Sequence, residues 1–135
     1  MFIFETKVRV RYAETDQMGY VYYGNYAAYY EVGRVEMLRS LGTSYKSLED
    51  NGVMLPVLEM QTRFIKPARY DEELVIKVYL KEKPAVKITF EYEVFGEGNE
   101  LINTGSTTLA FIDMKRNKPC RAPQDFIDRL QPYFE

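Results

Sequence analysis

The feature that most constrains the fold is a single stretch of helical periodicity in a chain that otherwise alternates as strands do. Between Asn25 and Leu41, apolar or small residues recur every three or four positions on one face: Tyr26, Tyr30, Gly33, Met37 and Leu41. A glycine inside a helix costs about 1 kcal/mol relative to alanine. Its presence here indicates that another backbone, which we expect to be a sheet, packs close to the helix.

Both ends of this helix carry residues that are typical of helix termini. Asn25, after Gly24, offers a starting cap, and Gly42 supplies the left-handed residue that often follows a last turn. A short helical or irregular stretch is expected at Ser44–Asp50, and a short terminal helix is expected after Ala122-Pro123, ending near Leu130.

Period-two alternation predicts five strands, one before the long helix and four after it. Their expected ranges are about Lys7–Tyr12, Val53–Ile65, Leu74–Lys81, Val86–Val94 and Leu101–Asp113. The strands are joined mostly by tight turns, including a strong hairpin signal at Gly96–Asn99. This order predicts an α+β fold, an antiparallel five-stranded sheet with one helix on one face, in a single domain over residues 1–135.

The sheet predicted here has surface that one helix cannot cover. A single helix leaves the second face of five strands open, and free sheet edges invite pairing with another chain. We therefore expect a homodimer or a homotetramer.

The composition is that of a globular protein, with 46% hydrophobic and 28% charged residues. The 18 basic and 20 acidic residues are scattered without long runs of one sign, so nucleic acid is not an expected partner. No stretch reaches membrane-spanning length, and the first residues lack the pattern of a signal peptide. The single cysteine, Cys120, cannot form an internal disulfide. A reducing cytoplasm fits these features best.

The chain contains no histidine, which restricts its possible chemistry more than any other count. Histidine is the commonest general base and a frequent metal ligand. A catalyst built from this sequence must use carboxylates, tyrosines, lysines or backbone groups. We expect neither a metal nor a cofactor.

A polar, aromatic and glycine-rich connector, Arg11 to Tyr26, joins the first strand to the long helix. Asp16 lies in it, near the helix N-terminus, where free N–H groups and the positive end of the helix dipole could hold an oxyanion. Most aspartates in loops before helices are caps or turn formers. The spacing alone therefore leaves a structural role and a catalytic role both open.

Two motifs in the sequence, one of which contains Asp16, carry a resemblance to a known family. The first is a spaced set in the connector and the helix: Asp16, Gly19, Val21-Tyr22-Tyr23, Asn25, Tyr26 and Glu36-Met37-Leu38. The second is the run from Phe64 to Glu72. Together they closely resemble the 4-hydroxybenzoyl-CoA thioesterase family of hotdog proteins. The resemblance implies a hotdog fold, a curved antiparallel five-stranded sheet wrapped around one long helix, with active sites at a dimer interface.

The resemblance implies an acyl-CoA thioesterase, an enzyme that hydrolyses a thioester to a free acid and coenzyme A. Asp16 falls on the family's catalytic acid, as nucleophile or general base. Tyr23 falls where the family uses a backbone N–H to polarise the thioester carbonyl. The implied substrate-binding segment comprises Gly19, Gly24, Asn25 and Tyr26. Many bacterial members carry a histidine at the position of Gly24, so a histidine-assisted mechanism is not available here.

Four further residues are candidates for binding the substrate. Glu59 could face the pocket or the solvent, and Arg63, Lys66 and Lys87 could hold the phosphates of coenzyme A, although basic residues on strand ends are often only solubilising. A non-catalytic acyl-CoA binding or interaction module with a hotdog pocket is the alternative function. A dehydratase is disfavoured because such enzymes pair an acid with histidine.

Overall fold

The computed structural model describes residues 1–135 and contains a five-stranded sheet of order β1-β4-β5-β6-β3. Every neighbouring pair in this sheet runs antiparallel. The strands are β1 (Phe2–Arg9), β3 (Val57–Phe64), β4 (Glu73–Leu80), β5 (Lys87–Phe95) and β6 (Leu101–Ala110). The α+β class and the antiparallel sheet expected from the sequence are confirmed.

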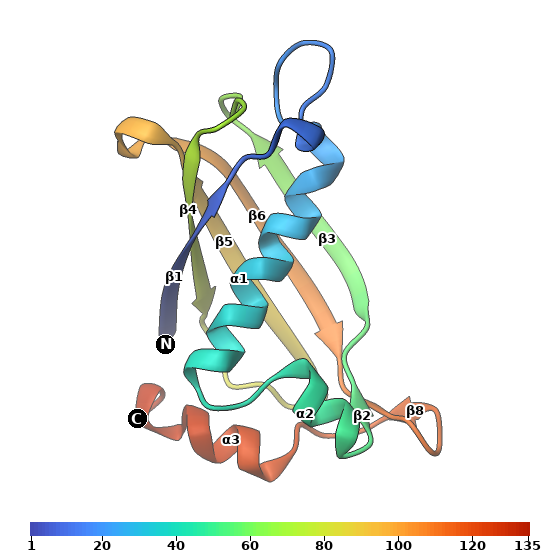
Figure 1. Cartoon of the computed structure of the whole chain (residues 1–135). Helices are drawn as coiled ribbons and strands as arrows, with labels where there is room; N and C mark the ends of the chain where they lie inside the picture. Colours follow the sequence, from blue (N-terminus) through green and yellow to red (C-terminus); the bar gives the residue numbers. More distant parts are fainter.

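The long helix α1 (Tyr26–Ser40) lies across one face of this sheet (Figure 1). Two short helices, α2 (Tyr45–Asp50) and α3 (Gln124–Leu130), lie at the end of the molecule opposite the start of α1. A small sheet at that end contains β2 (Val53–Met54), β7 (Ile112–Asp113) and β8 (Lys118–Pro119). The remaining elements are the 3-10 turns η1 (Tyr12–Glu14), η2 (Tyr23–Asn25), η3 (Glu97–Asn99) and η4 (Gln131–Tyr133).

The face of α1 that packs on the sheet is the one predicted from the sequence, and Tyr30 and Met37 on it are fully buried. A Cβ atom on Gly33 would lie 2.7 Å from Val78 Cγ2 and 3.1 Å from Ile76 Cγ2, both on β4. Side chains do not approach a Cβ as closely as 2.7 Å, so a residue larger than glycine would push α1 away from β4. The close approach expected at Gly33 is confirmed.

Several element boundaries differ from the expectation. The predicted strand Val53–Ile65 is divided into β2 and β3, because Pro56 between them has no N–H to donate to a ladder. The predicted strand Leu101–Asp113 divides at Phe111, where the chain leaves the large sheet and β7 pairs with β2. Strand β1 begins earlier than expected because all its residues pair with β4. The short strand β8 was not predicted.

The termini of α1 follow the expectation at one end only. Gly42 has φ +81°, the left-handed conformation expected after the last turn. The starting cap expected from Asn25 is wrong, because its side chain accepts no hydrogen bond from the first turn. Instead, Asn25 Nδ2 donates to the backbone oxygen of Glu14 at 2.8 Å. The amide thus connects the helix start to the preceding connector.

Buried polar groups connect α1 to strands β6 and β3 of the large sheet. The Tyr30 hydroxyl donates to Asn103 Oδ1 and lies 2.8 Å from Thr62 Oγ1. Asn103 is fully buried, and its Nδ2 donates to the same threonine hydroxyl at 3.0 Å. The Tyr30 ring also stacks on Tyr92, with centroids 4.2 Å apart. These contacts fix the orientation of α1 relative to β3 and β6.

Strand β3 is the less protected edge of the large sheet. It pairs with β6 on one side and with no strand on the other. Three apolar side chains that alternate along one face of β3 are substantially exposed, at 53% for Leu58, 40% for Met60 and 50% for Phe64. Helix α1 packs mainly on β1 and β4 and covers this part of the sheet only in part.

Candidate active site

The connector between β1 and α1 folds into a small hairpin whose tip holds Asp16. Thr15 and Val21 form an antiparallel bridge, and Asp16 N–H donates to the Tyr20 backbone oxygen at 2.8 Å. Gly19 in the tip has φ +82°, a conformation that side chains other than glycine rarely adopt. The hairpin is held to the chain after β3, because Val21 N–H donates to Ala68 O at 2.8 Å.

The Asp16 side chain has one oxygen engaged and one free. Oδ1 accepts hydrogen bonds from the backbone N–H groups of Met18 at 3.0 Å and Tyr20 at 3.2 Å. Oδ2 has no hydrogen-bond partner within the chain. The carboxylate therefore forms the turn, as the structural interpretation requires, and still presents an oxygen that could act on a substrate. The two roles are compatible at this residue.

The start of the helical segment presents free backbone donors beside this hairpin. Turn η2 runs directly into α1, and the N–H groups of Tyr23 and Gly24 have no acceptor within the chain. Such groups at a helix start carry partial positive charge. A Cβ on Gly24 would lie 2.8 Å from Cε2 of the Tyr22 ring, so a larger residue there would require this exposed ring to move.

Asp16 and the helix start border one cavity of about 280 Å³. Most of its lining is apolar, and the complete lining is Asp16, Met18, Tyr20, Val21, Tyr23, Tyr26, Phe64, Ile65, Lys66 and Pro67. Burial raises the pKa of Tyr26 to about 12, so its hydroxyl stays protonated at neutral pH. The cavity combines one carboxylate, unpaired N–H groups nearby and an apolar wall.

The structure brings together four of the sequence-predicted site residues in this lining: Asp16, Tyr23, Tyr26 and Lys66. Lys66 is paired with Glu100, with Nζ 3.1 Å from Oε1. Gly19, Gly24 and Asn25 belong to the surrounding framework and do not line the cavity.

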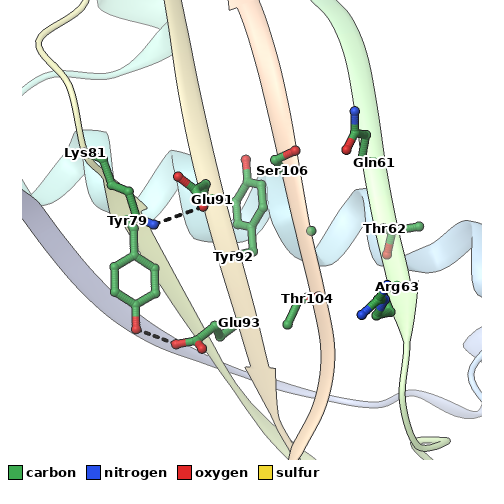
Figure 2. A pocket seen from close by; sticks show the side chains of 11 residues that line it. Gln61, Thr62, Arg63, Tyr79, Lys81, Glu91, Tyr92, Glu93, Thr104 and Ser106 are labelled. Atoms are coloured by element: carbon green, nitrogen blue, oxygen red, sulfur yellow. Dashed lines mark hydrogen bonds and ion pairs between the residues drawn. The ribbon is translucent and has the colours of Figure 1, made fainter.

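The other predicted binding residues lie elsewhere. Glu59 and Arg63 alternate with the apolar residues of β3 and share its opposite face. Arg63 borders a larger cavity of about 680 Å³ on the sheet face turned away from α1 (Figure 2). Lys87, on β5, borders a third cavity, of about 420 Å³. None of the three lines the cavity of Asp16.

The larger cavity is polar and its charged groups are mostly paired with each other. Lys81 lies 3.2 Å from Glu91, and the Tyr79 hydroxyl donates to Glu93 (Figure 2). Arg63 has no carboxylate partner there. This cavity has no unpaired acid beside free N–H donors, so the smaller cavity is the better candidate for catalysis.

Sequence reasoning did not assign a site role to several residues that shape the cavity. Met18 and Pro67 line it, and so do Phe64 and Ile65, which follow β3 to its end. Phe64 contacts Tyr26, with ring centroids 5.5 Å apart. The motif from Phe64 to Glu72 was the available signal, but it did not indicate which side chains would face the cavity.

Two further properties of the structure concern membrane-spanning helices and metal sites. None of its helices combines the length and hydrophobicity of a membrane span. No group of three or more acidic or cysteine side chains lies close enough together to hold a metal ion.

Comparison with known proteins places the chain in a family. A model described as the thioesterase-like superfamily matches residues 10–130. The acyl-CoA thioester hydrolase YbgC of Escherichia coli O6:H1 is 30% identical over 125 residues, which cover 93% of this chain and 93% of that protein.

Solved structures agree with this placement. The DHNA-CoA thioesterase of Staphylococcus aureus is 36% identical, with a TM-score of 0.90 over 98% of this chain and 89% of that chain. A mutant of 4-hydroxybenzoyl-CoA thioesterase complexed with 4-hydroxybenzoyl-CoA has a TM-score of 0.83 at 19% identity, over 94% and 97% of the two chains, and supports the fold alone. The chain thus belongs to the thioesterase-like superfamily and has the hotdog fold that its motifs implied.

Proposed function

We propose that this protein, an acyl-CoA thioesterase by its family relationships, cleaves its substrate with the Asp16 carboxylate while the Tyr23 backbone N–H binds the carbonyl oxygen. The observation that carries this proposal is the single apolar cavity bordered by both groups. An acyl group in the cavity would bring its thioester carbonyl between the acid and the helix start.

The chemistry requires little more than these two groups. A thioester carbonyl is less resonance-stabilised than an amide, and coenzyme A leaves as a stable thiolate. In one route, the carboxylate attacks the carbonyl carbon, the C–S bond breaks, and water then hydrolyses the mixed anhydride. In the other, the carboxylate accepts a proton from a water molecule that attacks the carbonyl. Both routes use the Asp16 oxygen that no group of the chain occupies.

The N–H of Tyr23 would stabilise the negative charge that develops on the carbonyl oxygen. Removing one such donor from an enzyme typically lowers the rate on the order of 100-fold to 1000-fold. The absence of histidine therefore need not prevent turnover, because neither step requires a side-chain acid on the leaving group.

The rest of the substrate would extend from this cavity. Lys66, at its border, is the candidate for a phosphate of coenzyme A, provided that the ligand displaces the Glu100 carboxylate. Contact of Glu59, Arg63 and Lys87 with the substrate stays a prediction. None of the three lines the Asp16 cavity, and Arg63 and Lys87 border other cavities.

A second copy of the chain would complete the site. The cavity borders the unpaired edge of β3, where Phe64 is half exposed. Pairing two β3 edges would cover the apolar row Leu58, Met60 and Phe64, which a lone chain leaves in water. We therefore propose a homodimer, or a homotetramer built from it, with the cavity at the interface. A reducing cytoplasm stays the prediction that Cys120 supports.

The experiment that tests this function is a screen of purified protein against aliphatic and aromatic acyl-CoAs and acyl carrier protein thioesters. Released thiol is measured with a chromogenic disulfide, and binding is measured in parallel by calorimetry. Catalytic thiol release with at least one thioester is the expected result. Tight binding of thioesters without hydrolysis would contradict it and favour the acyl-binding module.

A further inference from the structure

Glu14 is a mostly buried carboxylate that lies two residues before Asp16 and outside the cavity. Its side chain is 14% exposed. Oε1 accepts hydrogen bonds from the Arg11 N–H at 2.8 Å and from the Tyr29 hydroxyl at 3.0 Å. Oε2 accepts from the Arg11 guanidinium at 3.2 Å. The carboxylate thus connects the end of β1 to helix α1.

The backbone oxygen of the same residue makes two more connections. It accepts from Tyr22 N–H at 2.9 Å and from Asn25 Nδ2 at 2.8 Å. Tyr22 directly precedes the proposed oxyanion donor, and Asn25 directly precedes α1. One residue therefore holds both sides of the Asp16 hairpin and the start of the helix.

The connection from Glu14 to Tyr29 is the single hydrogen bond between residues 11–22 and α1. On its other side, the hairpin is fixed by backbone pairing of Val21 with Ala68. Loss of the Glu14 carboxylate would therefore leave the hairpin bonded to the helix start only through Asn25 Nδ2 and the Glu14 backbone oxygen, while the attachment to Ala68 remained. Asp16 lies in the hairpin, whereas Tyr23 lies in turn η2, which runs into α1.

We propose that Glu14 is a positioning residue that holds the Asp16 hairpin in register with the N–H groups at the start of α1. This inference rests on the proposed function for its effect on rate, but the geometry it describes can be measured separately. A displacement of about 1 Å between reacting groups can lower a rate on the order of 100-fold.

The kinetic test compares three variants with wild type. Glu14→Ala is expected to lower kcat about 10-fold to 100-fold per folded molecule, with a much smaller change in KM. Tyr29→Phe should lower kcat in the same direction. Glu14→Gln should restore most of the rate, because its amide oxygen can still accept from Tyr29. Combining Glu14→Ala with Tyr29→Phe should lower kcat no further than Glu14→Ala alone.

A control for loss of an arginine-bonded carboxylate is Asp125→Ala, whose exposed carboxylate accepts from the Arg129 guanidinium at 2.9 Å. It lies on α3 at the opposite end of the molecule, so kcat should be unchanged. Equal losses of kcat in Glu14→Ala and Asp125→Ala would show only general destabilisation and would overturn the positioning role.

Hydrogen–deuterium exchange tests the positioning role of Glu14 without a measurement of activity. In Glu14→Ala, the amides of residues 16–25 that are hydrogen-bonded in the wild type, such as those of Asp16, Tyr22 and Asn25, should exchange about 10-fold faster or more, while those of β4 stay as protected as in wild type. Unchanged exchange in residues 16–25 would overturn the inference, even for a protein that hydrolyses thioesters. A wild-type protein that releases no thiol would contradict the proposed function alone.

Discussion

Replacing Gly33 with alanine tests the packing of α1 on the sheet. The new Cβ would lie 2.7 Å from Val78 Cγ2 and 3.1 Å from Ile76 Cγ2, whereas ordinary contact begins at 3.4 Å. Both neighbours are fully buried, so neither can turn into solvent. An extra methyl group in a packed core costs about 1–3 kcal/mol, and the higher helix propensity of alanine offsets about 1 kcal/mol of that cost. We expect a net loss of up to about 2 kcal/mol in the free energy of unfolding.

The assay is urea unfolding followed by far-UV circular dichroism at one fixed protein concentration, because assembly would make the midpoint depend on concentration. Ala27→Gly, on the exposed face of α1, is the control for propensity and should lose about 1 kcal/mol. Val78→Ala in the Gly33→Ala background should remove most of the clash. A Gly33→Ala protein more stable than wild type by about 1 kcal/mol would refute the packing argument, since propensity alone would then decide the outcome.

Three other predictions concern buried groups and the sheet edge. Tyr30→Phe removes the donor to the fully buried Asn103 Oδ1 and should lower the free energy of unfolding by about 1–3 kcal/mol in the same urea assay. Burial raises the pKa of Glu14, but hydrogen bonds from Arg11 and Tyr29 outweigh it, so the folded pKa is lowered. The Glu14 carboxylate therefore contributes its full stabilisation above the unfolded pKa of about 4.3, and this contribution is lost as pH falls through the folded pKa. The difference in unfolding free energy between wild type and Glu14→Gln should shrink in urea titrations at acid pH. Met60→Asp should shift the mass measured by light scattering toward a monomer, and an unchanged mass would contradict the role of β3.

The parts of the fold that follow from local pattern were predictable from the sequence. The buried face of α1 is read directly from residue spacing, and Gly33 indicated its distance from the sheet. The passage of the chain from the large sheet to the small sheet after Phe111 could not be predicted from the sequence. The alternation of apolar and polar residues continues past Phe111, and the pairing partners are set by contacts distant in sequence. Strand β8 is too short to produce a pattern.

The candidate site was predictable through its acid, the helix start and Lys66. Asp16 and Tyr23 could be named from the motif. The lining from Phe64 to Pro67 depends on how the end of β3 meets the hairpin, which is a tertiary contact. Arg63 shows the same limit, because its charge suggested phosphate binding and the alternation of β3 directs it to the opposite face.

The catalytic role of Asp16 is tested most directly by the turnover of Asp16→Asn with a thioester that the wild type hydrolyses. The asparagine oxygen can still accept from the Met18 and Tyr20 N–H groups, so the hairpin and substrate affinity should persist. We expect a fall in kcat of about 100-fold or more, with acyl-CoA affinity retained. A variant that folds, binds acyl-CoA and turns over at the wild-type rate would contradict the catalytic role of Asp16.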